Sequence, residues 1–230
     1  MLLDVLLSDE LSWEVVIYSI LASLIVIFLT LPVHEFAHGF ISYKLGDSTA
    51  KHLGRLTLNP LAHLDLMGSA MILIIGFGWA KPVPVNMRSF KSPKRDMAIT
   101  ALAGPLSNLI IAFIMIFLGC LCYFLMGVFY NMPMALVYVL SAIVSILYLA
   151  ADINISLAIF NLIPIPPLDG SRILNAFLPD RIYYKLMQYE RYFFLIILAI
   201  VYLFDNLLIG LSDGVFTLLM NIAILPFRLF

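Results

Sequence analysis

Long uncharged apolar segments run through most of this chain and predict helices that span a membrane. The first covers residues 15–31 and contains no charged side chain. Residues 97–151 carry no charge at all, and their one turn-like break is Asn131-Met132-Pro133. Because a membrane-spanning helix needs about 20 mostly apolar residues, we predict a second span over about 97–130 and a third over 134–163.

Three shorter apolar segments complete the pattern. Residues 192–204, extended to about 209, predict a fourth span. Residues 215–227 fit a fifth span, a re-entrant segment or an interfacial helix. The run 67–79 is short and rich in glycine, which favours a re-entrant hairpin over a crossing. The sequence therefore predicts an all-α polytopic membrane protein, one domain over 1–230, with about five transmembrane helices and a short membrane-associated hairpin or extended segment.

The composition excludes soluble classes of protein. Of the 230 residues, 63% belong to the set AVILMFWYC and 12% are charged, and the mean hydropathy is +1.05. Ordinary globular domains are roughly 45–50% apolar and about 25% charged, so this chain has too little polar surface for a cytosolic enzyme. Its 13 basic and 14 acidic residues leave no positive excess for binding nucleic acid by charge. The first fourteen residues hold four acidic and no basic side chains, so they lack the cationic start of a signal peptide.

The basic residues predict how the chain is oriented. Eight of them lie in 44–95, between the first and second spans, and four lie in 172–191, between the third and fourth. Lysine and arginine concentrate in cytoplasmic loops, so we expect both segments in the cytoplasm, and a fifth span would bring Arg228 to the same side. We therefore expect a multi-pass protein of the cell (inner) membrane whose N-terminus is extracytoplasmic.

Ionisable residues at the end of the first apolar segment give the first indication of chemistry. His34, Glu35 and His38 lie in the pentapeptide HEFAH. Residues four apart share one face of a helix, so the two imidazoles can bind one zinc ion while Glu35 takes a proton from water. The alternative is a pair of core histidines with a glutamate that reaches the surface. Ionisable groups inside apolar segments are costly and usually functional, which favours the zinc site.

A catalytic zinc ion of this kind needs a third protein ligand and an open position for water. Asp169 follows the segment NLIPIPP, whose three prolines must break the third span near its cytoplasmic end. The first span approaches the cytoplasm at His34 and His38, so the three side chains are expected at similar depth. We predict Asp169 as the third ligand, with His63 and Asp65 as alternatives. The other downstream candidates are His52, Asp152 and Glu190.

Five segments resemble motifs of the site-2 protease family of intramembrane zinc metalloproteases, in the order that family has them. They are HEFAH at 34–38, NPLAHLD at 59–65, GWAKPVPVN at 78–86, AGPLSN at 103–108 and NLIPIPPLDG at 161–170. The second and third are similar to those of small prokaryotic members that lack a PDZ domain. The resemblance runs from about 29 to 174, and the segment DLMG at 65–68 departs from the D-P-x-G expected there.

The resemblance implies an activity and a set of site residues. His34, His38 and Asp169 would hold one zinc ion per chain, and Glu35 would activate water. The implied reaction, on the cytoplasmic side, is hydrolysis of peptide bonds in or near transmembrane segments of membrane proteins, for regulated intramembrane proteolysis or remnant clearance. The catalytic core would cover about 15–178, with accessory helices over about 190–230. The expected partners are a transmembrane substrate and the lipid bilayer, without nucleic acid, and the oligomeric state is left open.

Three polar residues inside apolar segments carry further hypotheses. Asn108 donates its amide either to the oxyanion of the scissile carbonyl or to a neighbouring helix. Asn161 either holds the end of the broken third span or touches the substrate. Asp152 either lines a path for water or joins Ser156 and Asn154 in a polar seam.

Residues 79–86 predict an extended segment, because prolines at alternate positions exclude a helix. Proteases hold their substrates extended, and main-chain pairing to a free edge needs no particular sequence. We hypothesise that Val83 and Val85 lie along the substrate cleft, and a plain surface loop is the alternative.

Two other classes of function fit part of the pattern. A transporter or channel also uses broken helices and intramembrane carboxylates, but it has no need of Glu35, and no inverted repeat is detectable in the sequence. An inactive family member that acts as a membrane adaptor is the third hypothesis, although every named catalytic position is present.

Overall fold

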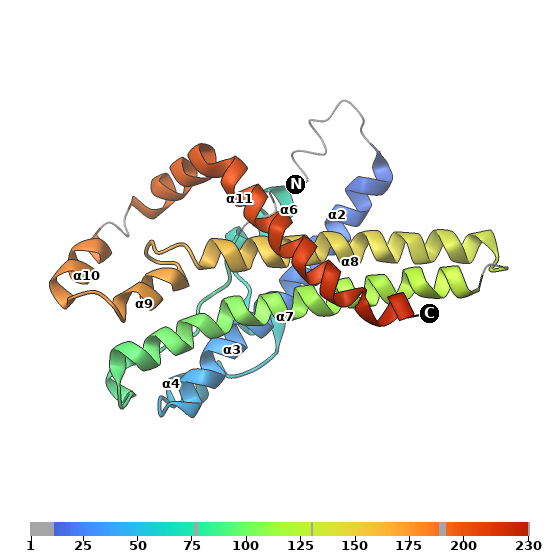
Figure 1. The fold of residues 1–230 in the computed structure, drawn as a ribbon. Coiled ribbons are helices and arrows are strands. Elements are labelled where there is room, and N and C mark those ends of the chain that lie inside the picture. Colours follow the sequence, from blue (N-terminus) through green and yellow to red (C-terminus); the bar gives the residue numbers. More distant parts are fainter. Residues whose placement is uncertain (1–11, 76–77, 130, 189–191, 230) are drawn as a thin grey trace.

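The computed structural model describes residues 12–75, 78–129, 131–188 and 192–229. These residues form helices, turns and an extended segment, with no strand among them. Four of the described helices are long and apolar enough to cross a membrane, namely Trp13–Lys44, Pro93–Val128, Met134–Asn161 and Leu203–Ala223. The prediction of an all-α polytopic membrane protein is confirmed (Figure 1).

The first span is a continuous helix that extends beyond the predicted 15–31. It consists of α2 (Trp13–Ile25), a π-helical turn (Val26–Thr30) and α3 (Leu31–Lys44). Single π-helical turns inside α-helices are frequent at functional sites. Here the turn directly precedes the segment that contains HEFAH, so the motif lies on the spanning helix itself.

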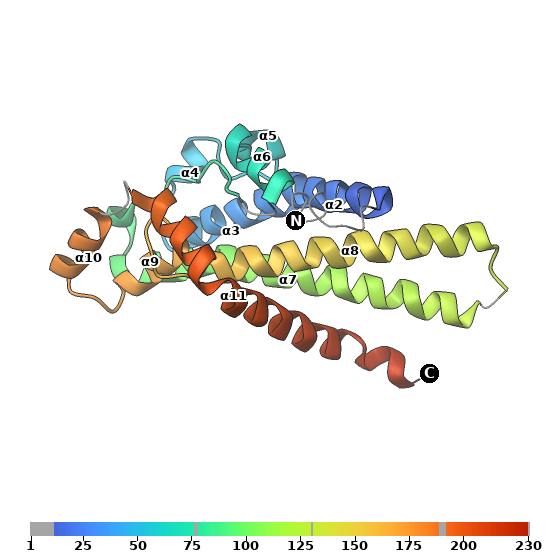
Figure 2. The ribbon, with the colours of Figure 1, turned by 90° about the horizontal axis from the view of Figure 1, so that it is seen from above.

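A glycine turn ends α3 and leads into three short helices. Gly46 has a positive φ of 111°, and its N–H donates to Tyr43 O while Asp47 N–H donates to Ser42 O. This is a Schellman ending, for which glycine has the required conformational freedom. The following helices α4 (Thr49–His52), α5 (Pro60–His63) and α6 (Leu66–Ile75) gather on one side of α3 (Figure 2).

The glycine-rich run predicted as a hairpin forms α6 and an extended return that packs against it. A Cβ atom added to Gly68 would lie 2.8 Å from the carbonyl carbon of Trp79, and one added to Gly78 would lie 2.7 Å from the Ile72 side chain. Glycine on both sides therefore permits the contact. The tip of this hairpin, 76–77, lies outside the described residues. Residues 78–86 continue as an extended segment to a short 3-10 turn at Met87–Ser89.

Helices α7 (Pro93–Val128) and α8 (Met134–Asn161) form an antiparallel pair at the centre of the molecule (Figures 1 and 2). Their bounds confirm the predicted second and third spans. A Cβ atom added to Gly119 of α7 would lie 2.9 Å from Cζ of Tyr148 on α8, and small residues of this kind let helices approach closely in a membrane. The buried core joins this pair to the first span and includes Val26, Ile27, Ile111, Ile116, Ile155 and Leu157.

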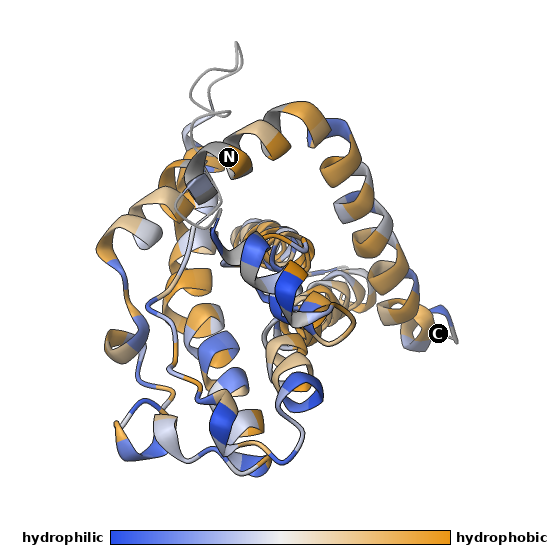
Figure 3. Cartoon of the chain, turned by 90° about the vertical axis from the view of Figure 1, so that its left-hand side faces the viewer, coloured by the Kyte–Doolittle hydropathy of each residue, from blue (hydrophilic) through white to orange (hydrophobic). Residues whose placement is uncertain are grey.

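The C-terminal region differs from the prediction of two separate apolar segments. The runs predicted over 192–209 and 215–227 belong to one helix, α11 (Phe193–Ala223), with a kink at Phe204. The polar residues between the two runs lie inside this helix, where Ser212 is buried and its Oγ donates to Oδ1 of Asp152 on α8. Among the described residues α11 contributes one candidate span, Leu203–Ala223, which includes most of the run 215–227, and the coloured part of this helix is largely hydrophobic (Figure 3).

The expected position of Arg228 depended on a separate fifth span, and residues 215–223 belong to α11 instead. In both views the C-terminus lies at the end of the bundle that carries the α7–α8 connection (Figures 1 and 2). The opposite end carries α4, α9 (Asp169–Asn175) and α10 (Asp180–Met187). The argument for orientation therefore rests on the basic residues of 44–95 and 172–191 alone.

Candidate functional site

Helix α3 and the start of α9 bring together the three predicted metal ligands. His34 and His38 lie one turn apart on α3, and Asp169 begins α9 after the broken end of α8. The two Nε2 atoms are 3.0 Å apart, and Asp169 Oδ2 lies 3.1 Å from His38 Nε2 and 3.4 Å from His34 Nε2. All three side chains are buried, and they form a group that could hold a metal ion.

The hydrogen bonds of the two Nδ1 atoms show that the cluster of His34, His38 and Asp169 fits a cation. His34 Nδ1 donates to Asn108 Oδ1 at 3.2 Å, and His38 Nδ1 donates to the main-chain oxygen of Thr100 at 2.7 Å. Each neutral imidazole then carries its proton on Nδ1 and a lone pair on Nε2. Two lone pairs and a carboxylate oxygen thus face one another, an arrangement that repels itself unless a cation lies between them. Two imidazoles and one carboxylate are a usual ligand set of catalytic zinc.

Gly104 lets α7 approach the two imidazoles. A Cβ atom added there would lie 2.6 Å from Cε1 of His34, 2.5 Å from Cε1 of His38 and closer still to Nε2 of His38. The sequence marks Gly104 as a small residue in AGPLSN, but the spacing along one helix does not reveal which neighbour needs the space. This glycine was therefore missed as a site residue.

A compact turn holds Asp169 in place between α8 and α9. A Cβ atom added to Gly170 would lie 2.5 Å from the main-chain oxygen of Ile163, so the turn closes tightly behind the carboxylate. Burial favours the neutral acid, but when the facing imidazoles of His38 and His34 carry a proton, their charge and hydrogen bonds outweigh that effect and hold the pKa of Asp169 well below its usual range. Arg172 Nη1 lies 4.0 Å from the other carboxylate oxygen, Oδ1. Asp169 is therefore present as a carboxylate.

The alternative third ligands have other partners. His63 is buried, and its Nε2 donates to Thr57 O at 2.8 Å. Asp65 Oδ1 accepts from the N–H of Gly68 at 2.8 Å, at the start of α6. Neither side chain joins the cluster on α3 and α9. Glu190 lies outside the described residues.

Glu35 faces the same cavity as the three predicted ligands. The cavity has a volume of about 560 Å³ and lies between α3, the return of the hairpin, α7 and the broken end of α8. Glu35 is 8% exposed, and its Oε2 accepts a hydrogen bond from the N–H of Val83 at 2.7 Å. Other residues that line the cavity include Trp79, Asn108, Leu157, Phe160, Asn161 and Arg172. The base, the ligands and the two candidate asparagines therefore share one space.

The two asparagines make different contacts. Asn108 is fully buried, with Oδ1 on His34, and no protein partner for its Nδ2 occurs among the described residues. Asn161 Nδ2 donates to Leu157 O at 2.9 Å, in the last turn of α8. The hydrogen bond of Asn161 matches the expected role of holding the broken helix end, while Asn108 contacts a predicted ligand directly.

The extended segment borders the cavity, but the predicted free edge is wrong at Val83. Val83 lines the cavity and Val85 is not among its lining residues. The N–H of Val83 is already donated to Glu35, and proline has no N–H, so residues 82–84 offer a substrate no free main-chain donor.

Asp152 lies away from the cavity and belongs to a polar seam between α8 and α11. Its Oδ1 accepts from Ser212 Oγ at 3.3 Å, and Ser212 Oγ is 3.3 Å from Ser156 Oγ. Asn154 is not part of this seam, because its Nδ2 donates to Ala150 O within α8. Asp152 is thus connected to Ser156 through Ser212, and the expected contact with Asn154 is wrong.

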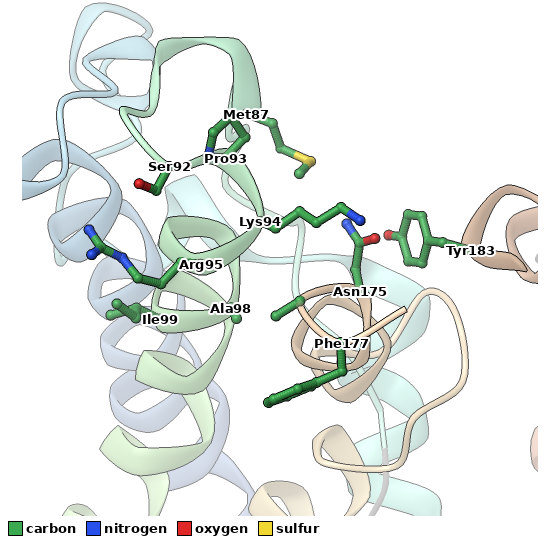
Figure 4. Close-up of a pocket in the computed structure, with 11 residues that line it drawn as sticks. Met87, Ser92, Pro93, Lys94, Arg95, Ala98, Ile99, Asn175, Phe177 and Tyr183 are labelled. Carbon is green, nitrogen blue, oxygen red and sulfur yellow. The ribbon is translucent and has the colours of Figure 1, made fainter. Parts of the chain in front are cut away.

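A second cavity, of about 910 Å³, lies at the end of the bundle that carries α9 and α10. Figure 4 shows the polar ends of Lys94, Asn175 and Tyr183 converging there, with the ring of Phe177 farther away. The Lys94 ammonium donates to Leu178 O at 2.8 Å. None of the predicted metal ligands lines this cavity, nor does Glu35.

Comparisons with known proteins agree with this arrangement. The family model Peptidase family M50 matches residues 22–204. Three curated relatives are each named "Putative zinc metalloprotease". YwhC of Bacillus subtilis (strain 168) is 42% identical over 176 residues, which are 76% of this chain and 78% of that protein. Rip2 of Mycolicibacterium smegmatis is 30% identical over 177 residues, or 75% of this chain and 63% of that protein.

The third relative, MJ0611 of Methanocaldococcus jannaschii, is 30% identical over 111 residues, or 48% of this chain and 50% of that protein. No solved structure shows a significant match. The matched region of the family model contains every residue of the buried cluster on α3 and α9, and the spanning helices place that cluster in a membrane protein. The chain therefore belongs to peptidase family M50, the site-2 protease family, and is a zinc metalloprotease of membranes.

Proposed function

We propose that this protease hydrolyses peptide bonds in or near the transmembrane segments of other membrane proteins. The observation that carries the proposal is the position of Glu35, His34 and His38 on a helix that is itself a candidate span. The opposite wall of the cavity includes Asn108, on a second candidate span. A peptide that reaches these groups must come to the depth of the helices that carry them.

His34, His38 and Asp169 are the residues that would hold the zinc ion. When bound, zinc polarises the scissile carbonyl and lowers the pKa of water toward neutrality. Glu35 takes the proton of the attacking water on its carboxylate and passes it to the nitrogen of the leaving amine. The protein residues around Glu35 exclude bulk solvent, since the Glu35 side chain is buried.

Asn108 serves the reaction through both ends of its amide. Oδ1 fixes the ring of His34, which keeps the lone pair of Nε2 directed into the site. Nδ2 is the donor left for the oxyanion that develops on the scissile carbonyl, as amide side chains act in other hydrolases. Asn161 holds the end of α8 beside the cavity through its bond to Leu157 O.

The active site belongs on the cytoplasmic side, and the N-terminus on the other side, of the cell (inner) membrane. The support is the concentration of lysine and arginine in 44–95 and 172–191 at the end of the bundle that carries α4, α9 and α10. The first eleven residues lie outside the described part of the chain. A site with this access serves regulated intramembrane proteolysis and remnant clearance alike.

Cleavage of a model transmembrane substrate by the purified protein in liposomes tests the proposal. The matched control is Glu35→Gln, which is not a ligand and should keep the zinc. A helix hides its amide bonds in internal hydrogen bonds, so a substrate with a glycine or proline near the cleaved bond should be cut faster than one with alanine. Zinc binding without cleavage, or zinc-independent transport of an ion, would contradict the protease and support an adaptor or a transporter.

A further inference from the structure

The extended segment 79–86 contributes one main-chain donor to the active site, and the sequence isolates it. Pro82 and Pro84 have no N–H, so the N–H of Val83 is the sole main-chain donor in the run 82–84. It donates to Oε2 of Glu35 at 2.7 Å. Val83 is 5% exposed and Glu35 is 8% exposed, so the bond is shielded from water. An N–H bond to a carboxylate is among the stronger kinds of hydrogen bond.

Contacts on both sides of Val83 hold the segment in place independently of Glu35. Lys81 N–H donates to His63 O at 2.8 Å, and Arg55 donates to Lys81 O at 2.7 Å and to Pro82 O at 3.2 Å. On the other side, Asn86 N–H donates to Asp47 Oδ2 at 2.7 Å. The donor is therefore fixed by the scaffold before it meets the carboxylate.

Helix α3 is shaped to receive this segment one turn after Glu35. A Cβ atom added to Gly39 would lie 3.3 Å from Cγ1 of Val83, so the glycine lets the valine lie close against the helix. Asp47, which holds Asn86, also accepts from Ser42 Oγ at 3.0 Å, and Ser42 belongs to α3. The segment and the helix that carries the base thus form one unit.

We propose that the N–H of Val83 is a positioning group for the catalytic base. It holds Oε2 of Glu35 and leaves Oε1 to take the proton of water and deliver it to the leaving nitrogen. The proposal rests on the proposed function of Glu35 as that base. A glutamate has three rotatable side-chain bonds, and a misplacement of about 1 Å costs roughly 10²-fold in rate, so a fixed donor at one oxygen directly serves the reaction.

Replacement of the peptide N–H by an ester oxygen tests the proposal without changing a side chain. The hydroxy acid analogue of valine is incorporated at position 83 in the full-length protein. Position 85 provides the matched control, because Val85 also follows a proline and does not line the cavity. We expect the ester at 83 to lower kcat by about 10- to 100-fold, with KM and bound zinc within twofold of the wild type, and the ester at 85 to change none of the three. A kcat at 83 within twofold of the wild type, or a loss of zinc that accounts for the fall, would overturn the proposal.

The ester at 83 has a side effect, because it also makes the Pro82 carbonyl, which accepts from Arg55, a weaker acceptor. Variants of Arg55 control for this effect. Arg55→Ala removes both hydrogen bonds of the guanidinium, yet the bonds of Lys81 and Asn86 still hold the segment. Arg55→Ala should therefore lower kcat less than the ester at 83, and Arg55→Lys should restore part of the loss. If Arg55→Ala alone reproduces the whole effect of the ester, the N–H of Val83 is not the positioning group.

Thermal unfolding separates failure of this proposal from failure of the proposed function. In the wild-type background, the ester at 83 should lower the melting temperature more than the ester at 85. In a Glu35→Ala background the two esters should have equal effects, because the acceptor is gone. This cycle needs no substrate, so it tests the contact even if the wild type fails to cut a membrane substrate. Equal effects of the two esters in both backgrounds would overturn the proposal.

Discussion

Replacement of Gly104 by alanine should empty the zinc site, although the substitution removes neither a zinc ligand nor a side-chain hydrogen bond. The new methyl group would lie 2.6 Å from Cε1 of His34 and 2.5 Å from Cε1 of His38, whereas carbon atoms pack at about 3.5–4.0 Å. The overlap is therefore about 1 Å on both rings. Zinc–nitrogen distances are about 2.0–2.1 Å and tolerate deviations of about 0.2 Å. The methyl group must push the rings or α7 by more than the site tolerates.

Relaxation of the surroundings cannot easily absorb this overlap. The ring of His34 is bonded to Asn108, and the ring of His38 is bonded to the main chain of Thr100, and both partners lie on α7 with Gly104. A shift of α7 away from the rings would stretch both bonds. We therefore expect proteolytic activity to fall by about 100-fold or more, the scale of a 1 Å misplacement, together with a loss of bound zinc.

The assay measures zinc content, cleavage in liposomes and the melting temperature of the same preparation. Gly127→Ala is the matched control, since Gly127 also lies on α7 and an added Cβ there has nothing within 4 Å. Alanine favours a helix over glycine by about 1 kcal/mol, so the control should keep its activity with unchanged or higher stability. A folded Gly104→Ala protein with one zinc ion per chain and wild-type cleavage would refute the close approach of α7.

Three further predictions address the base, the third ligand and the anchor of the extended segment. Glu35→Gln should retain zinc by metal analysis and lose about 10²-fold or more in cleavage rate; loss of zinc would contradict its role as base. Asp169→Asn should lower zinc occupancy together with activity, since the neutral amide is a weaker donor; a fully loaded, active variant would leave the third ligand unassigned. Burial alone would raise the pKa of Asp47, but hydrogen bonds from Thr49, Asn86 and Ser42 outweigh it and lower that pKa from 3.8. The stabilisation from the Asp47 carboxylate is therefore full above about pH 4 and is lost progressively as the pH falls further. Lowering the pH through this range should then reduce the melting temperature less in Asp47→Asn than in the wild type.

The features that sequence predicts best are those fixed by local spacing. The four-residue interval places His34 and His38 on one face of a helix whatever the fold, and prolines 164, 166 and 167 must end α8 before Asp169. Both conclusions need only helix geometry and the missing N–H of proline. They were enough to select the residues that the fold brings together.

The features that sequence missed depend on contacts between distant elements. Nothing local to Gly104 indicates that two imidazoles from α3 lie against it. The prolines predict an extended segment around Val83, but its N–H finds its acceptor on a helix 48 residues earlier in the chain. The sequence predicts separate segments at 192–209 and 215–227, whereas both belong to α11, and the contact of Ser212 between them with Asp152 joins residues 60 positions apart.

Anomalous scattering at the zinc edge from crystals of the purified protein tests the central claim most directly. The measurement locates the ion and its protein ligands without reference to activity. We predict one zinc ion per chain, bound by Nε2 of His34, Nε2 of His38 and a carboxylate oxygen of Asp169, with Glu35 close by but not coordinating. An ion bound instead by His63 or Asp65, or coordinated by Glu35, would contradict the account.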